Sequence, residues 1–226
     1  MRTLSNRLGT IAGLVPKGSR IADIGTDHGY LPIYLSQNGI SDYILACDIN
    51  AKPLESAKRN IEAADIKNVY LRLSDGLEAI SPDEIDTVVI AGIGGEVISG
   101  IIERSAWIKS PDYTLILQPT TSPEKLREFL ALSGFRVKEE KAVQENGKLY
   151  SVMVVKFTGD TTPLKPHELY IGKLTPDGEA ASFYIEKQLK RVTTLSLDLE
   201  GIPEKQSEYR YFSYVSRTIQ IILGGN

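Results

Sequence analysis

The stretch from Arg20 to Tyr30, RIADIGTDHGY, places a short apolar strand directly before a glycine turn and the start of a helix. A second apolar run follows, YILACD, and it ends in the carboxylate of Asp48. This order is typical of the nucleotide-binding half of a doubly wound α/β domain, in which ligands lie at the carboxyl ends of the strands. Gly25 lets the backbone turn sharply and come close to a ligand. Asp48 is placed to accept hydrogen bonds from the ribose hydroxyls of an adenosine.

The residues after Gly25 depart from the dinucleotide-binding fingerprint. That fingerprint has the form G-x-G-x-x-G, so that a pyrophosphate can lie on a helix N-terminus, whereas this chain continues with TDHG. A carboxylate at this turn would repel a diphosphate, which argues against a nicotinamide-dependent dehydrogenase. It suits a cationic ligand without phosphates, such as S-adenosylmethionine. The alternative is a turn that Asp23 and Gly25 only shape, but the spacing to Asp48 favours S-adenosylmethionine.

Apolar runs alternate with amphipathic segments along the chain, which predicts a doubly wound α/β sheet with helices on both faces. A final antiparallel hairpin that turns at residues 145–147 is typical of methyltransferase-like sheets and not of the parallel dehydrogenase halves. Seven strands are expected, over residues 20–24, 43–48, 68–73, 86–91, 113–117, 135–143 and 149–157. Helices are expected over residues 3–15, 28–38, 51–64, 96–104 and from residue 122 onward.

The character of the chain changes after Gly159. Residues 161–166, TTPLKP, are typical of a linker. Apolar residues then recur near heptad spacing on both sides of a break at residues 201–203, which predicts an antiparallel α-helical hairpin. We therefore expect a ligand-binding domain over residues 1–159 and a C-terminal helical hairpin over residues 160–226.

Composition narrows the class of protein without choosing a function. The chain has 226 residues, 42% of them hydrophobic, and a net charge of −3, so it can bury a full core and has no overall nucleic-acid signature. The only cysteine, Cys47, falls in an expected buried strand, where a small core residue is the simplest interpretation. No apolar run is long enough to span a bilayer. We expect a cytoplasmic protein without a membrane segment or a metal, either a monomer or a weak dimer.

Two further strand ends carry an acid or glycines. Asp75 and Gly76 follow the third expected strand, and the run from Gly92 to Gly95 follows the fourth. In a doubly wound sheet these loops line the same crevice as Gly25 and Asp48. Asp75 is placed to accept from the adenine amino group, and the glycines leave room where the donor and the acceptor meet. Each feature alone is an ordinary turn, and their coincidence at successive strand ends is the argument for a site.

These residues resemble the bacterial tRNA adenine-22 N1-methyltransferases over essentially the whole chain. The motifs that carry the resemblance are NRL at 6–8, ADIGTDHGYLP at 22–32, SDGL at 74–77, IAGIGG at 90–95 and LQP at 117–119. The resemblance implies a class I methyltransferase fold, S-adenosyl-L-methionine as the donor and a tRNA adenine N1 as the acceptor. Ile93 stands where methionine is expected, Asp48 where glutamate is common, and Thr120 where asparagine is expected. The C-terminal appendage is also short.

Site residues follow from the strand ends and the resemblance together. Catalytic roles are expected for Asp27, His28 and Ile93. Cofactor binding is expected for Arg7, Asp23, Gly25, Asp27, His28, Leu31, Asp48, Asp75, Gly76, Gly92 and Gly94. Adenine N1 has an unprotonated lone pair at neutral pH, so the reaction needs positioning more than a base. The carboxylate of Asp27 would stabilise the positive charge that passes to the adenine ring. His28 would orient the acceptor, or alternatively pack beside Tyr30.

RNA binding has less support from the residues themselves. Residues 1–20 contain four basic side chains and no acid, which predicts a basic patch beside the pocket: Arg2, Arg7, Lys17 and Arg20. The hairpin adds basic residues, but they are mixed with acids, as on an ordinary solvated helix face. Two other functions stay open from the sequence. One is methylation of a small molecule or protein, and the other is a non-catalytic adenosine-binding or interaction module.

Overall fold

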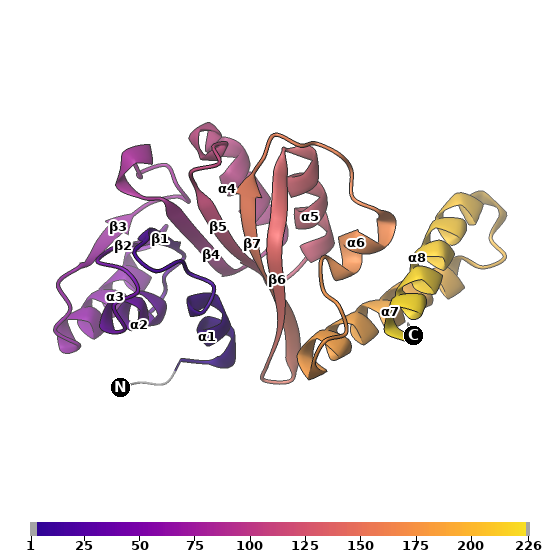
Figure 1. Ribbon diagram of the computed structural model, residues 1–226, viewed down its shortest axis with the longest axis horizontal. Helices are drawn as coiled ribbons and strands as arrows, with labels where there is room; N and C mark the ends of the chain where they lie inside the picture. Colours follow the sequence, from indigo (N-terminus) through magenta and orange to yellow (C-terminus); the bar gives the residue numbers. More distant parts are fainter. Residues whose placement is uncertain (1–3, 225–226) are drawn as a thin grey trace.

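The computed structural model describes residues 4–224 and contains one seven-stranded sheet in the order β3-β2-β1-β4-β5-β7-β6 (Figure 1). Strands β1 to β5 pair in parallel, whereas β7 pairs antiparallel with both β5 and β6. The predicted α/β class with an antiparallel last strand is therefore confirmed. The strands are β1 (Arg20–Ile24), β2 (Tyr43–Asp48), β3 (Val69–Leu73), β4 (Thr87–Ile93), β5 (Thr114–Pro119), β6 (Phe135–Glu145) and β7 (Lys148–Phe157).

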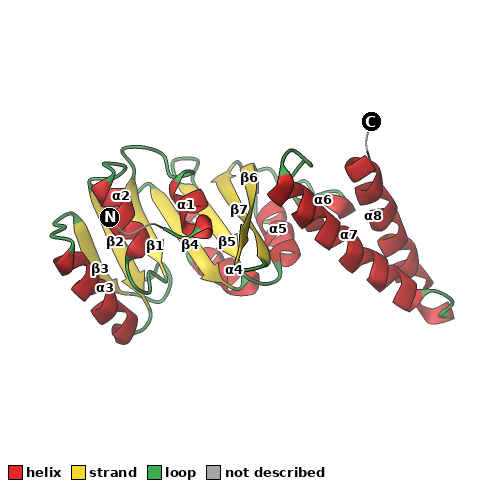
Figure 2. Ribbon diagram, turned by 90° about the horizontal axis from the view of Figure 1, so that it is seen from below, coloured by secondary structure: helices red, strands yellow, loops and turns green. Residues whose placement is uncertain are grey.

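Helices cover both faces of the sheet, as Figures 1 and 2 show. One core holds residues of α1, α2 and α3, and the other holds residues of α4 and α5. Neighbouring strand residues point to opposite cores, since Ile21 lies in the first and Ala22 in the second. The helices are α1 (Asn6–Ala12), α2 (Tyr30–Gln37), α3 (Ala51–Ala63), α4 (Gly95–Arg104), α5 (Pro123–Leu132), α6 (Pro166–Ile171), α7 (Glu179–Leu199) and α8 (Gln206–Gly224).

The element bounds agree with the predicted ones to within a few residues, with two differences. The leading helix is shorter than residues 3–15, because Ser5 caps it and Gly13 ends it, and the first three residues lie outside the described part of the chain. Helix α6 was not predicted, since six residues are too few for a periodic pattern. The turn at Asn146 and Gly147 has positive φ at both residues, as a two-residue hairpin turn with the twist of its strands requires.

Helices α7 and α8 form the predicted hairpin and extend away from the sheet (Figure 2). A third core joins them to α6, with Ile185, Val192 and Ile219 fully buried. This core also receives the partly buried Ala142 and Leu149 from β6 and β7. The hairpin is therefore packed onto the β6 edge of the sheet. These side-chain contacts fix its position relative to the sheet.

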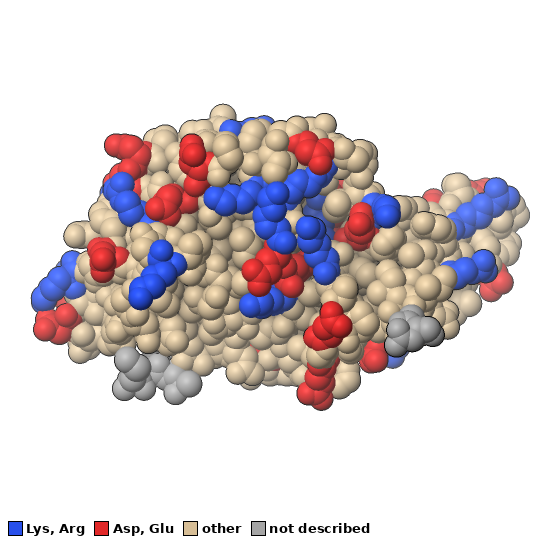
Figure 3. Space-filling view, viewed as in Figure 1, with Lys and Arg blue, Asp and Glu red and all other residues tan. Residues whose placement is uncertain are grey.

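Arg7 and Arg20, two of the four residues of the predicted N-terminal basic patch, lie at opposite ends of β1. Arg20 begins β1, so it lies at the edge of the sheet opposite to the ends that carry Gly25 and Asp48, and it donates to the backbone oxygen of Asp83. Arg7 is paired with Glu145, and Arg2 lies outside the described residues. On the face in Figure 3, the largest group of basic side chains lies over β6 and β7 with acids interspersed.

Candidate functional site

A cavity of about 340 Å³ opens at the carboxyl ends of β1, β2 and β4. The order of the sheet reverses between β1 and β4, which is where ligands bind in open α/β sheets. Most of the predicted site residues line this cavity. They are Arg7, Asp23, Gly25, Asp27, His28, Leu31, Asp48, Gly92 and Ile93, joined by Leu8, Thr26, Tyr30 and Ala91.

The turn after β1 is held against β2 by its own backbone. The amides of Gly25 and Thr26 both donate to the carbonyl oxygen of Cys47 at 2.9 Å. Gly25 has a φ of +78°, and a Cβ placed there would have no atom within 4 Å. The glycine is therefore required by the backbone conformation, and it leaves the wall of the cavity open. Asp27 also has a positive φ, of +49°, which aspartate tolerates better than most residues.

Two buried carboxylates set the charge at the inner end of the cavity. Asp23 and Asp48 are 5% and 8% exposed. Burial, together with the nearby charge of Asp48, raises the pKa of Asp23 to about 6. Oδ1 of Asp48 accepts from the backbone amide of Asn50 at 2.9 Å, which orients this carboxylate at the end of β2. A cationic ligand in this cavity would relieve the unfavourable burial of both charges.

The irregular end of β4 around Gly92, here called the glycine turn, is held from outside the nucleotide-binding half. Gln118 at the end of β5 is fully buried, and its Oε1 accepts from the amide of Gly92 at 3.1 Å. The same oxygen accepts from Nη1 of Arg7 at 2.8 Å. Glu145 receives two hydrogen bonds from Arg7, one from its backbone amide and one from Nε. A Cβ on Gly92 would lie 3.3 Å from Nη1 of Arg7, so the glycine admits the guanidinium to the edge of the cavity.

Asp27 and His28 lie at the mouth of the cavity with largely exposed side chains, 69% and 47%. Oδ2 of Asp27 is 3.6 Å from Nε2 of His28. The His28 ring also stacks on Tyr30, with a centroid distance of 5.2 Å. The packing interpretation of His28 is thus observed, and its catalytic role stays a prediction.

Asp75, Gly76 and Gly94 do not line the cavity. Asp75 is half-exposed and accepts from Nη2 of Arg104 at 3.2 Å. A Cβ on Gly76 would lie 2.8 Å from the side chain of Ile101, so this glycine serves packing against α4. The loop is nevertheless adjacent to the cavity, because the amide of Ser74 donates to the carbonyl of Asp48 at 2.9 Å. The cofactor roles of these residues stay predictions.

Sequence reasoning did not assign Gln118 or Glu145 to the site. A signal for Gln118 exists, since a polar side chain interrupts the fully buried strand TLILQP next to its carboxyl end. Glu145 has no comparable signal, because it lies at a hairpin tip where acids are common. Among residues 4–224, no cluster of His, Cys, Asp and Glu side chains is arranged to hold a metal ion. Within the same residues, no helix has the length and apolar character of a membrane span.

Comparisons with known proteins agree with this geometry. Residues 4–153 match the family model described as a methyltransferase domain. The tRNA (adenine(22)-N(1))-methyltransferase of Bacillus subtilis is 38% identical over 218 residues, which cover 96% of this chain and 89% of that protein. The structure of TrmK from M. capricolum with S-adenosyl-homocysteine is 28% identical, with a TM-score of 0.80 over 98% of this chain and all of that one. This chain belongs to the tRNA (adenine(22)-N(1))-methyltransferase family.

Proposed function

We propose that this protein transfers the methyl group of S-adenosyl-L-methionine to N1 of an adenine in tRNA, at position 22. The observation that carries the proposal is the cavity at the reversal point of the sheet, lined by Asp23, Asp27 and Asp48 and opened by glycines. Its relatives supply the reaction and the position in the tRNA. A tRNA substrate agrees with the cytoplasmic setting expected from the sequence. A monomer or weak dimer and a domain boundary at residue 159 stay predictions.

The residues present fit S-adenosylmethionine. This molecule carries a sulfonium and an ammonium group, which suit a cavity with carboxylates, and it carries no phosphate. Asp48, at the end of β2, is placed for the ribose. Arg7 is the one Lys or Arg among the residues that line the cavity, and its guanidinium is suited to the carboxylate of the methionine part. The cavity therefore offers complementary charges for both ends of the amino acid.

S-adenosylmethionine supplies an electrophilic methyl group when it is bound. The N1 lone pair of adenine forms the new bond to carbon as the bond from sulfur to carbon breaks, so positive charge moves from the sulfur to the adenine ring. The chain contributes positioning, which supplies roughly 7–11 kcal/mol of a barrier when the geometry is right. Asp27 at the cavity mouth stabilises the charge on the ring. Ile93 and the adjoining glycines shape the place where the two substrates meet.

The experiment is transfer of a radiolabelled methyl group from S-adenosylmethionine to unmodified transcribed tRNA, followed by nucleoside analysis. Label in N1-methyladenosine, lost when adenosine-22 is replaced by guanosine, is the expected result. Label in N1-methyladenosine that survives this replacement would overturn the position. Binding of S-adenosylmethionine without label in RNA would overturn the acceptor and leave a methyltransferase for a small molecule or protein, or a non-catalytic binding module.

A further inference from the structure

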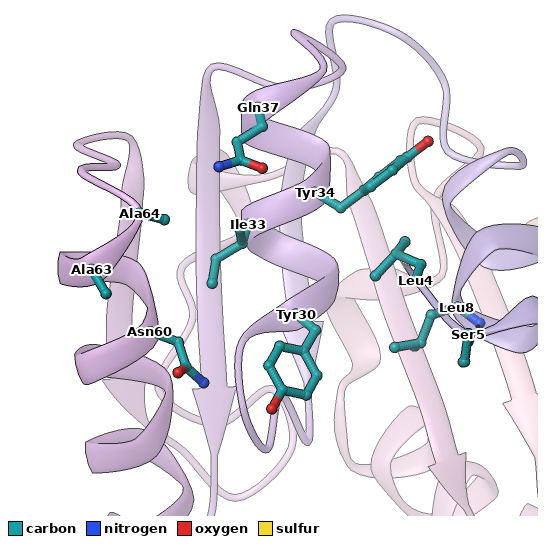
Figure 4. Close-up of a pocket in the computed structure, with 10 residues that line it drawn as sticks. All are labelled: Leu4, Ser5, Leu8, Tyr30, Ile33, Tyr34, Gln37, Asn60, Ala63 and Ala64. Carbon is teal, nitrogen blue, oxygen red and sulfur yellow. Dashed lines mark hydrogen bonds between the residues drawn. The ribbon is translucent and has the colours of Figure 1, made fainter. Parts of the chain in front are cut away.

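A second cavity, of about 480 Å³, lies over helix α2 between α1 and α3 (Figure 4). We call it the α2 groove. In Figure 4, α3 forms one side and α1 with the residues before it forms the other, with side chains of α2 between them. Its lining residues are Leu4, Ser5, Leu8, Tyr30, Ile33, Tyr34, Gln37, Asn60, Ala63 and Ala64.

The α2 groove adjoins the cofactor cavity. Leu8 and Tyr30 line both of them. The ring of Tyr30 stacks on His28, which lies at the mouth of the cofactor cavity. Nδ2 of Asn60 in the groove donates to the backbone oxygen of His28 at 2.9 Å. The groove therefore lies beside the mouth of the cofactor cavity and shares part of its wall.

The chemistry of the groove suits a flat, uncharged ligand. None of its lining residues is Lys, Arg, Asp or Glu, so it offers nothing to neutralise a phosphate. Leucine, isoleucine and alanine side chains supply apolar walls, and Tyr30 and Tyr34 supply aromatic rings. The side-chain amides of Gln37 and Asn60 and the hydroxyl of Ser5 are polar groups suited to hydrogen bonds with the edge of a heteroaromatic ring.

We propose that the α2 groove binds the nucleobase next to the target adenine in the RNA chain. This inference rests on the proposed function. N1 lies on the pairing edge of adenine, so the target must be unpaired and turned out of the stack before it can accept a methyl group. Its neighbour then loses a stacking partner. An aromatic surface beside the site replaces that partner at roughly 1–3 kcal/mol per base, with little dependence on sequence.

The test fills the groove with a bulky side chain. Ala63 lies near the end of α3 and is exposed, so Ala63→Trp is compatible with the fold. We expect the KM for tRNA to rise roughly five- to hundredfold, which is the stacking free energy converted at 1.4 kcal/mol per tenfold. The Kd for S-adenosylmethionine should stay within about twofold of the wild-type value, which also reports a folded protein. The matched control is Ala106→Trp, at another exposed alanine that does not line the groove.

A second RNA substrate distinguishes the loss of base binding in the α2 groove from general damage to the enzyme. RNA with an abasic nucleotide on one side or the other of the target should raise the KM of the wild-type enzyme by the same factor as Ala63→Trp. With Ala63→Trp that abasic RNA should show no additional loss, because the base is already excluded. A wild-type KM in Ala63→Trp, or losses that multiply, would overturn the proposal. If Ala63→Trp does not fold, Tyr34→Leu should raise the KM, and the control Tyr70→Leu, at an exposed tyrosine of β3 outside the groove, should not. Absence of any methylation of RNA by the wild-type protein would instead overturn the proposed function.

Discussion

Arg7 and Gln118 are 111 residues apart and are joined by a hydrogen bond of 2.8 Å from Nη1 of the guanidinium to Oε1 of the amide. The same oxygen accepts from the amide of Gly92. One buried oxygen atom therefore connects the N-terminal helix α1 to the glycine turn that borders the cofactor cavity. Gln118 is fully buried, so an apolar side chain in its place would deprive both Arg7 and Gly92 of this acceptor.

Gln118→Leu keeps the approximate size of the side chain and removes this acceptor. The amide of Gly92 is left unpaired, and the free energy of unfolding should fall by about 1–3 kcal/mol. The Kd for S-adenosylmethionine should rise, because Arg7 and the glycine turn lose their common partner. Urea unfolding and calorimetric titration measure the two effects. Gln144→Leu, at an exposed glutamine of β6, is the control; equal effects in both variants would contradict the argument.

The raised pKa of Asp23 predicts that the stability of the ligand-free protein depends on pH. Its pKa is about 6 in the folded state against 3.8 for an unperturbed aspartate, so the folded protein holds the proton more tightly. The protonated Asp23 therefore contributes its full stability below pH 3.8, and this contribution is lost as the pH rises through 6. The loss is roughly 3 kcal/mol, since each pKa unit corresponds to 1.36 kcal/mol. Asp23→Asn removes this loss. The free energy of unfolding of the variant should therefore rise relative to that of the wild type between pH 4 and pH 7. Urea unfolding across that pH range measures the effect, and Asp42→Asn, at an exposed position, is the control. If the unfolding free energies of the wild type and Asp23→Asn change with pH in parallel, the prediction is wrong.

Arg127 of α5 joins the helical hairpin to the sheet from a fully buried position. Its Nη2 donates to Glu140 at 2.6 Å and to Tyr184 of α7 at 3.2 Å. Removing one partner of a buried ion pair leaves an uncompensated charge, so Arg127→Met should cost about 3–5 kcal/mol in thermal or urea unfolding. Arg191→Met removes the half-exposed partner of Glu124, which also links α7 to α5, and should cost about 1 kcal/mol or less. A similar cost for both would mean that burial does not decide the strength of this link.

Two Gly→Ala substitutions should change the free energy of unfolding in opposite directions. A Cβ on Gly95 at the start of α4 would lie 2.6 Å from the backbone oxygen of Ser122, so Gly95→Ala must displace the loop after β5. We expect a loss of about 1–3 kcal/mol in unfolding free energy. A Cβ on Gly9 in α1 would have no atom within 4 Å, and Gly9→Ala should stabilise the protein by up to about 1 kcal/mol. Chemical denaturation of both proteins decides the matter, and equal signs would show that these contacts do not control stability.

Asp27→Asn should keep the fold and lose turnover. The side chain is largely exposed, and asparagine tolerates the positive φ of this position. Loss of the carboxylate should lower kcat for tRNA by roughly 10²-fold, because the charge on the adenine ring is no longer stabilised. Asp83→Asn, at an exposed position before β4 on the opposite edge of the sheet, is the control. Turnover like that of the wild type in Asp27→Asn would remove Asp27 from the mechanism.

The sequence by itself determined the seven strands and the doubly wound class of the sheet with its antiparallel last strand. Apolar runs bounded by turns predicted β1 to β5 within about two residues, since burial on both faces leaves a local imprint on composition. The acid that ends β2, the glycine that follows β1 and the glycine near the end of β4 are likewise local signals. The sequence therefore placed Gly25, Asp48 and Gly92 together at the carboxyl ends of the strands.

The tertiary structure alone decided which distant side chains meet. Arg7 and Gln118, Arg127 and Glu140, and the three helices around the α2 groove are brought together by packing. No periodicity reports such contacts, because a side chain's direction relative to another element depends on the angle at which the two elements pack. Arg7 and Arg20 of the expected basic patch are likewise separated by the length of β1, because Arg7 lies at the cavity and Arg20 begins the strand. Asp75 and Gly94 do not line the cavity. Residue type alone does not specify the direction that the backbone takes in the loops after β3 and β4.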